Sequence, residues 1–181
     1  MARYTISVMR KVILGVGISL DGYLARPNGD IDFLFMPKDY PMGEFAAAID
    51  TTLMGRKTFA AALRMGGTFG GGMTNYVFSR TVAAGEQDGV VFVKQSPAAL
   101  VGRLRRTAGK HIWLMGGGEL ARAFLKADLV DELSLGVVPV LLGAGIPLFP
   151  AGFPQRDFRL VENRTYAKGL IALTYQRVRK K

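Results

Sequence analysis

Two segments of the chain combine residue types that suit phosphate binding. Residues 52–59 (TLMGRKTF) and residues 113–120 (WLMGGGEL) each lead from an apolar run through Met-Gly into a pattern typical of a helix. Glycine at the end of a strand lets a ligand approach the backbone without meeting a Cβ. The helix that follows presents free N–H groups and the positive end of its dipole. Because ligands collect at this edge of open α/β sheets, the two segments together predict a dinucleotide whose pyrophosphate lies between two helix N-termini.

The commonest nucleotide-binding fingerprints are absent from both segments. Neither contains Gly-x-Gly-x-x-Gly or Gly-x-x-x-x-Gly-Lys-Ser/Thr. A glycine that serves only the geometry of a tight turn therefore remains the alternative interpretation of each segment taken singly.

Cysteine and histidine usage narrows the chemistry further. The 181 residues include no cysteine and a single histidine, His111. The absence of cysteine excludes disulfides, thiolate catalysis and cysteine-bound metals. With one histidine, the chain also has very few residues from which to build a zinc site or a Ser-His-Asp triad. We expect no metal centre, and we interpret His111, at the start of an expected strand, as a structural residue.

The formal net charge of +10 raises nucleic acid or a phosphorylated ligand as a partner. The basic residues are scattered, however, apart from a cluster formed by Arg103, Arg105, Arg106 and Lys110. No aromatic residues alternate with this cluster, as a surface that stacks bases would require. We therefore expect a solvated helix face there and no nucleic-acid partner.

Two apolar stretches imitate membrane segments. Residues 12–20 follow several basic residues, as in a signal peptide, but the run is short and no cleavage site follows it closely. Residues 135–153 carry no charge, yet three prolines and several glycines would leave backbone groups of a spanning helix unpaired in lipid. The sequence thus predicts a cytoplasmic protein without a membrane segment.

Apolar runs alternate with helical patterns along the chain. Strands are expected at residues 11–20, 51–54, 75–78, 90–93, 111–115 and 132–140, and helices at 41–49, 56–63, 96–107 and 119–126. The segments 157–166 and 170–178 predict an antiparallel hairpin. This order predicts an α/β fold, a three-layer sandwich with a mixed, mostly parallel sheet and helices on both faces. We interpret residues 1–9 as an extension and residues 10–181 as a single domain.

Family resemblance adds to this pattern. Gly55-Arg56-Lys57-Thr58, Phe78-Ser79-Arg80 and Gly116-Gly117-Gly118-Glu119-Leu120 resemble, in order and spacing, the NADPH-binding segments of dihydrofolate reductases. Residues 137–149 (VVPVLLGAGIPLF) and 19–22 (SLDG) are similar to the reductase domain of the bifunctional riboflavin-biosynthesis deaminase-reductase and its stand-alone relatives. The resemblance covers about residues 11–178 and implies a dihydrofolate-reductase-like fold.

The resemblance implies NADPH as the cofactor. The residues that it places on the phosphates and the adenosine side are Gly55, Arg56, Lys57 and Thr58. Those near the 2′-phosphate, which suits arginine and hydroxyl donors, are Ser79 and Arg80. Those against the pyrophosphate and the nicotinamide are Gly116, Gly117, Gly118, Glu119 and Leu120. The resemblance further implies a cis peptide between Gly116 and Gly117, where a trans bond in a tight turn is the alternative.

The substrate side offers three candidate acids. Residues 21–39 are polar, contain a turn signal and predict a long functional loop. By resemblance to dihydrofolate reductases, an acid after this loop would lie near the substrate, and Asp39 or Glu44 has that position. Asp21 follows the first strand at the ligand edge and is the preferred candidate. For each acid singly, a solvated or capping role is the alternative. We interpret Trp113 as a core residue.

The expected function is NADPH-dependent reduction of a small heterocyclic substrate. The resemblance implies hydride transfer to a C=N or ring-opened ribosyl group on an aminopyrimidine, the activity of a 5-amino-6-(5-phosphoribosylamino)uracil reductase in riboflavin biosynthesis. Alternatives are reduction of dihydrofolate or another small molecule, and a non-catalytic nucleotide-binding module. Residues 137–149 are longer than one buried strand needs, and related reductases pair, so we expect a homodimer with this segment near the interface.

Overall fold

The computed structural model describes residues 9–69 and 72–179. Of the expected extension, only Met9 belongs to the described residues. The helices are α1 (Met42–Ala47), α2 (Arg56–Arg64), α3 (Pro97–Arg105) and α4 (Gly118–Lys126). The strands are β1 (Val12–Ser19), β2 (Tyr23–Ala25), β3 (Ile49–Gly55), β4 (Thr74–Phe78), β5 (Gly85–Gln87), β6 (Val90–Val93), β7 (His111–Gly116), β8 (Glu132–Val138), β9 (Ile146–Pro147), β10 (Phe158–Thr165) and β11 (Ile171–Arg177).

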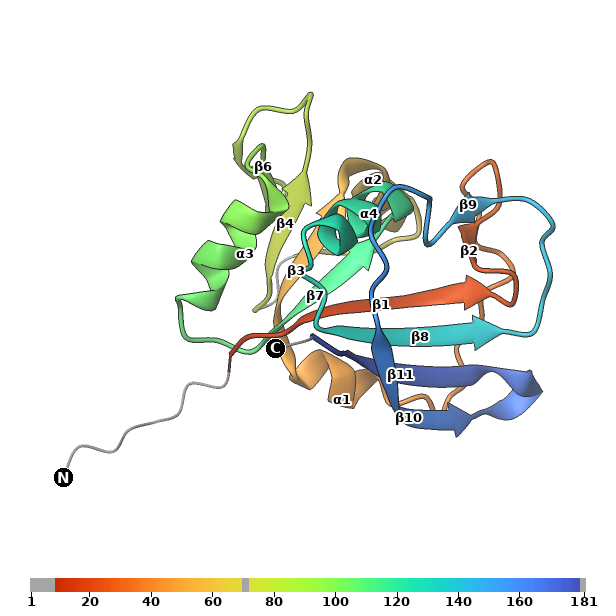
Figure 1. Ribbon diagram of the computed structural model, residues 1–181. Coiled ribbons are helices and arrows are strands. Elements are labelled where there is room, and N and C mark those ends of the chain that lie inside the picture. The colour runs from red at the N-terminus through yellow and green to blue at the C-terminus, as the bar shows by residue number, and fades with distance from the viewer. Residues whose placement is uncertain (1–8, 70–71, 180–181) are drawn as a thin grey trace.

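A nine-stranded mixed sheet forms the middle layer, in the order β10-β11-β8-β1-β7-β3-β4-β6-β5 (Figure 1). The strands from β8 to β6 in this order run parallel to one another, whereas β10, β11 and β5 are antiparallel to their neighbours. The expected fold class and the C-terminal hairpin are confirmed. The strands β2, β5 and β9 have no counterpart among the expected elements, because at two or three residues they are too short for a periodic pattern.

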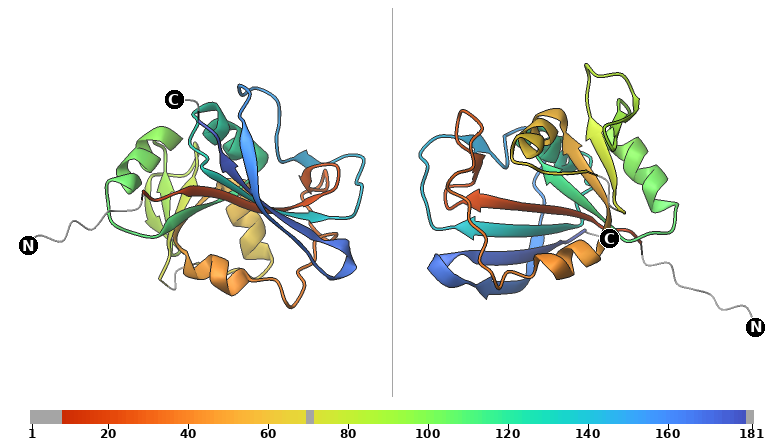
Figure 2. Two further views of the ribbon diagram at one scale, coloured as in Figure 1. Left: turned by 60° about the horizontal axis from the view of Figure 1, so that its bottom comes forward. Right: turned by 180° about the vertical axis from the view of Figure 1, so that it is seen from behind.

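Helices cover both faces of this sheet (Figure 2). On one face α3 and α4 pack against the apolar side of the central strands, and Leu100 and Phe124 are fully buried there. On the other face Phe59 of α2 packs with Met54 of β3, and Phe45 of α1 contacts Trp113 of β7. None of the helices within the described ranges is long and apolar enough to cross a membrane.

The central strand β1 differs between its two faces. Val12, Leu14 and Ile18 belong to the core that α3 and α4 cover. The opposite face carries Gly15 and Gly17, because successive side chains of a strand point to opposite sides of the sheet. A Cβ on Gly15 would lie 2.9 Å from the indole nitrogen of Trp113, so this side of the strand has no room for a side chain.

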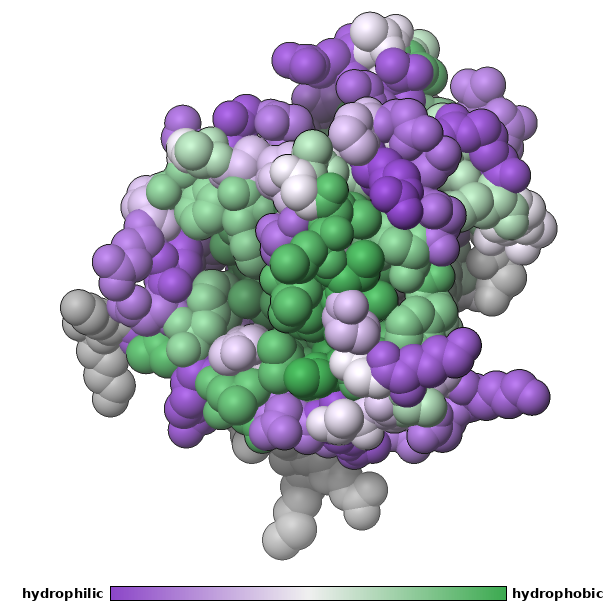
Figure 3. Space-filling model, turned by 90° about the vertical axis from the view of Figure 1, so that its right-hand side faces the viewer, coloured by the Kyte–Doolittle hydropathy of each residue, from purple (hydrophilic) through white to green (hydrophobic). Residues whose placement is uncertain are grey.

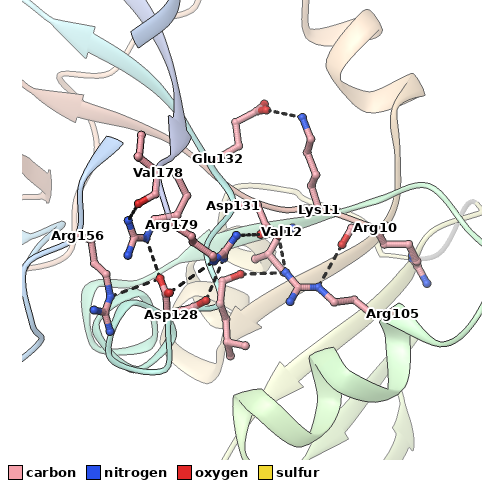
Figure 4. Close-up of polar contacts among 12 residues, drawn as sticks. Arg10, Lys11, Val12, Arg105, Asp128, Asp131, Glu132, Arg156, Val178 and Arg179 are labelled. Atoms are coloured by element: carbon pink, nitrogen blue, oxygen red, sulfur yellow. Dashed lines mark hydrogen bonds and ion pairs between the residues drawn. The ribbon is translucent and has the colours of Figure 1, made fainter. Parts of the chain in front are cut away.

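Ion pairs connect neighbouring segments at the end of the sheet where β1 begins (Figure 4). One carboxylate oxygen of the buried Asp131 accepts hydrogen bonds from the backbone N–H of Val12, at 2.8 Å, and from Arg105. The other oxygen accepts from Arg179, at 2.9 Å. A single carboxylate thus joins the start of β1, the end of α3 and the C-terminal segment.

The segment between β8 and β10 folds back over the opposite end of the sheet. Its short strand β9 pairs with β2, and Leu148 is fully buried and donates its N–H to the Gly22 carbonyl at 3.0 Å. The segment also meets the start of α4, where a Cβ on Gly118 would lie 2.2 Å from the Pro147 carbonyl oxygen. This close approach requires glycine at position 118.

Removing the Asp131 carboxylate is expected to destabilise the protein strongly. An Asp131→Ala variant leaves the Arg105 guanidinium and the Val12 N–H without their buried partner, and such a loss costs about 3–5 kcal/mol. Urea unfolding followed by circular dichroism measures the change in the free energy of unfolding. The control is Glu86→Gln on the exposed strand β5, for which we expect a change within about 0.5 kcal/mol. A stability for Asp131→Ala that matches the control would show that the carboxylate does not hold these three segments together.

Two glycine-to-alanine variants are expected to change stability in opposite directions. Gly118→Ala forces a Cβ against the Pro147 backbone and is expected to destabilise the fold by about 1–3 kcal/mol. Gly102→Ala in α3 meets only the flexible end of Arg106, at 3.8 Å, and is expected to stabilise the helix by about 0.4–1 kcal/mol. Thermal and urea unfolding of both variants test the difference, and equal signs would refute it.

Candidate functional site

The two Met-Gly segments end neighbouring strands, β3 and β7, and begin α2 and α4 at the same edge of the sheet. The N-cap residues are Gly55 for α2 and Gly117 for α4, and no side chain caps either helix. Helix α3 differs, because the Ser96 hydroxyl accepts a hydrogen bond from the Ala99 N–H at 3.2 Å. The first-turn N–H groups of α2 and α4 are therefore available to an anionic ligand.

The backbone between β7 and α4 has an unusual geometry. The peptide between Gly116 and Gly117 is cis, as the family resemblance implied, and Gly116 has a φ of +88°. A Cβ on Gly117 would lie 3.5 Å from the Thr58 hydroxyl, so the first turn of α2 faces this peptide. A Cβ on Gly55 would meet nothing within 4 Å. A ligand can therefore approach the backbone at Gly55, and Gly116, Gly117 and Thr58 lie together.

Three cations lie near this edge without a partner. Arg56, Lys57 and Arg80 are exposed, and none of them forms an ion pair or a side-chain hydrogen bond with the residues that the structure describes. Arg80 follows Ser79, whose hydroxyl accepts hydrogen bonds from the backbone N–H groups of Thr81, at 3.3 Å, and of Val82, at 3.0 Å. The Ser79 side chain thus shapes the turn on which Arg80 is presented.

The other expected cofactor residues have structural contacts. Gly118 is buried against Pro147, and Leu120 packs against the core on the α3 and α4 side. Glu119 is exposed in the first turn of α4 and forms an ion pair with Arg122. Of these three residues, only Glu119 has an exposed side chain.

A cavity of about 540 Å³ lies on the face of the sheet that α1 covers. Its floor is formed by small residues that the strand register places side by side. Gly17 of β1 pairs with Gly136 of β8, which pairs with Ala172 of β11. In the next row Gly15 pairs with Ser134, which pairs with Thr174.

Aromatic side chains form the walls of this cavity. Trp113 donates its indole N–H to the Gly15 carbonyl at 2.8 Å, and its ring meets that of Phe45 edge-on, with centroids 5.2 Å apart. Tyr40 and Tyr166, also in the lining, have ring centroids 5.2 Å apart, and burial raises the pKa of the Tyr40 phenol. The expectation that Trp113 belongs to the core is wrong, because the glycine beneath it leaves its ring on the cavity.

The charged side chains in the lining are mainly acidic. They are Glu44, Glu132, Glu162 and Arg164. Glu132 forms an ion pair with Lys11 at 3.1 Å, and Glu162 one with Arg164 at 2.6 Å. Glu44 has no ion-pair partner among the residues in the described ranges. No group of three or more His, Cys, Asp or Glu side chains in these ranges could hold a metal ion.

The three candidate acids occupy different places. Asp21 is exposed and outside the lining, where it accepts hydrogen bonds from the Ser19 hydroxyl at 2.6 Å and from the backbone of Leu142 and Gly143. The hydrogen bond from Ser19 lowers the pKa of Asp21 and thus favours its ionised form. Asp39 is also exposed and outside the lining. Glu44 alone among the three lines the cavity.

One residue of β1 in the cavity lining also lies near the Gly116–Gly117 peptide, with its side chain against the core on the α3 and α4 side. Val16 contributes to the lining, and its Cγ1 lies 3.8 Å from the position of a Cβ on Gly116. Sequence reasoning missed Glu132, Ser134, Gly136, Ala172 and Thr174, because their shared face exists only once the strands are in register. The alternation of small residues along the expected strands was the one available signal.

Comparison with known proteins agrees with this architecture. Two proteins of Bacillus subtilis (strain 168) are similar along nearly the whole chain. YwjB is 33% identical over 165 residues, covering 89% of this chain and 95% of YwjB. YyaP is 32% identical over 182 residues, covering 92% and 94% respectively.

Solved structures share the fold. A protein from Shewanella sp. PV-4 whose name refers to riboflavin biosynthesis superposes with a TM-score of 0.82 at 28% identity, over 93% of this chain and 99% of that one. The diaminohydroxyphosphoribosylaminopyrimidine deaminase/5-amino-6-(5-phosphoribosylamino)uracil reductase of Thermotoga maritima gives 0.74 at 14% identity, over 94% and 57%. A pyrimidine reductase-like protein from Corynebacterium diphtheriae gives 0.69 at 15% identity, over 94% and 93%.

The sequence model of one family covers most of the chain. This family is described as the RibD C-terminal domain, and the match extends over residues 10–172. The match runs from the residues before β1 to the first residues of β11 and includes α2 and α4. The chain therefore belongs to the RibD C-terminal domain family, and this membership together with the structural neighbours supports a riboflavin-pathway reductase-type function.

Proposed function

We propose that the protein is an NADPH-dependent reductase that acts on a small pyrimidine-like or pterin-like heterocycle. The observation that carries the proposal is the pair of helix N-termini without side-chain caps, beside three cations that have no partner among the described residues. An aromatic cavity lies on the face of the same sheet that α1 covers. A dinucleotide phosphate fits the first feature, and a planar substrate fits the second.

The residues at the edge have complementary roles in this proposal. The first-turn N–H groups of α2 and α4 bind the pyrophosphate, and Thr58 adds a hydroxyl donor. Arg56 and Arg80 bind the 2′-phosphate, for which a planar guanidinium is well suited. The nicotinamide lies against the backbone of Gly116 and Gly117 in this proposal, because neither residue carries a Cβ that would keep the ring away.

The reaction is the reduction of a C=N bond. Bound NADPH would supply the hydride for the carbon, and a proton would join the nitrogen, so that C=N would become CH–NH. The rings of Phe45 and Trp113 exclude water from the acceptor, and the Glu44 carboxyl is the group in the lining that is free to bind or relay the proton. The activity named for the Thermotoga protein is one reaction of this type, and dihydrofolate reduction is another.

Cofactor preference tests the proposal directly. NADPH is expected to bind much more tightly than NADH, because a charged contact is worth about 1.5–3 kcal/mol. Loss of one contact in Arg56→Ala or Arg80→Ala should weaken NADPH about ten- to a hundredfold and leave NADH nearly unchanged. Quenching of Trp113, the single tryptophan, measures binding, with Arg64→Ala at the far end of α2 as the control. Equal affinities for the two cofactors would overturn the assignment.

A homodimer is the assembly that we propose. Figure 3 shows apolar side chains gathered on the side of the molecule where β2 and β9 lie. Leu141, Ile146 and Phe149 of the expected interface segment are exposed, whereas Leu148 is buried in the protein's own core. A second copy of the chain would cover these exposed side chains.

A charge in this segment is expected to weaken the dimer. Leu141, which is 70% exposed, loses nothing from the monomer's core when it is changed to glutamate. Light scattering of the unchanged protein at micromolar concentration should give twice the monomer mass, and Leu141→Glu should shift it toward the monomer. Met65→Glu at the end of α2 is the matched control. A monomeric unchanged protein would remove the proposal.

A further inference from the structure

The turn between β1 and β2 is held together by its own hydrogen bonds. Gly22 has a φ of +84°, a conformation that favours glycine, and donates its N–H to the Ser19 carbonyl at 3.0 Å. Ser19 is fully buried, and its hydroxyl accepts from the Tyr23 N–H at 2.9 Å and donates to the Asp21 carboxylate at 2.6 Å. The turn therefore holds the Asp21 side chain in one direction, although that side chain is exposed.

Residues 140–148 wrap around this turn. At one end the Val140 carbonyl accepts from the Leu20 N–H at 2.9 Å. At the other end the Leu148 N–H donates to the Gly22 carbonyl at 3.0 Å. Both ends of the segment are thus attached to the turn through the backbone.

The middle of the segment is attached through the side chain of Asp21. One of its carboxylate oxygens accepts hydrogen bonds from the backbone N–H groups of Leu142, at 3.1 Å, and of Gly143, at 2.8 Å. Among the residues that the structure describes, no other side chain forms a hydrogen bond to residues 140–148. The position of this part of the segment therefore depends on one carboxylate.

The same segment packs directly against the first residue of α4. Pro147 pairs with Tyr23 of β2, and its carbonyl oxygen lies only 2.2 Å from the position of a Cβ on Gly118. No side chain separates the two backbones there, so a displacement of Pro147 is passed on to the first turn of α4. The N–H groups of that turn are the ones that we assign to the cofactor's pyrophosphate.

Asp21 is well suited to holding backbone N–H groups and poorly suited to giving up a proton. It lies outside the cavity lining. The hydrogen bond from Ser19 lowers the pKa of Asp21, and those from Gly143 and Leu142 act in the same direction. The ionised carboxylate carries no proton, whereas it is a strong acceptor for the N–H groups that reach it.

We propose that Asp21 is a positioning residue for the cofactor, which acts through residues 140–148 on the N-terminus of α4. This inference rests on the proposed function for the placement of the pyrophosphate at that helix. Without the carboxylate, the N–H groups of Leu142 and Gly143 lose their acceptor, and the segment that packs against Gly118 relaxes. The first turn of α4 then no longer holds its N–H groups in place for the pyrophosphate.

Two nucleotides that share the adenosine half of the cofactor test this role by calorimetric titration of the full chain. NADPH reaches both helix N-termini in the proposed function, whereas adenosine 2′,5′-bisphosphate has the 2′-phosphate but no nicotinamide half. Asp21→Ala is expected to weaken NADPH about tenfold, a size typical of a residue that acts through others. Its affinity for the bisphosphate should change by less than about twofold, because Arg56 and Arg80 remain in place. A general loss of structure would weaken both nucleotides.

Two further variants serve as the rescue and the control. Asp21→Asn keeps an oxygen for the two backbone N–H groups, and its amide can donate to the Ser19 hydroxyl, so NADPH affinity should stay within about threefold of that of the unchanged protein. Asp32→Ala removes an exposed acid of the same connection, which pairs with Arg26 at 2.6 Å, and should leave both affinities unchanged.

The pattern of the two affinities decides the outcome. Equal weakening of both nucleotides in Asp21→Ala, or an NADPH affinity that matches Asp32→Ala, would overturn the inference. A loss of NADPH affinity in Asp21→Asn as large as in Asp21→Ala would also overturn it. Failure of the unchanged protein to bind either nucleotide would overturn the proposed function, and this inference with it.

Discussion

The architecture depends on the unequal faces of strand β1. This strand lies between β7 and β8 near the middle of the sheet. The size of its side chains therefore affects how the layers on both faces of the sheet pack. Val12, Leu14 and Ile18 fill the core under α3 and α4. Gly15 and Gly17 carry no side chain on the opposite face, so the indole of Trp113 packs over the first and Leu34 over the second. One strand thus contributes apolar side chains to the core on one face and glycines to the cavity on the other.

A carboxylate at each end of this strand connects it to neighbouring segments. At its start, Asp131 binds the Val12 N–H together with two arginines. At its end, Asp21 holds the backbone of the segment that returns over β2 and the start of α4. Each of these two carboxylates is satisfied by hydrogen bonds from its own neighbours, so neither needs a ligand to hold its place.

Charge is divided between the two halves of the site. The excess of basic residues provides free guanidinium and ammonium groups beside two helix N-termini, where a phosphate gains most from them. In the cavity lining, Glu132 is paired with Lys11 and Glu162 with Arg164, whereas Glu44 has no ion-pair partner among the described residues.

The sequence by itself determined the order of the main strands and helices, the two Met-Gly turns and the family, because these follow from local patterns and contiguous motifs. It also placed Glu44 among the candidate acids. Only the tertiary structure decided that Asp21 anchors a loop, that Trp113 lines a cavity and that the small residues form its floor. The floor joins strands that are far apart in the chain. Their register comes from backbone pairing and packing of the whole sheet, and no local pattern encodes it.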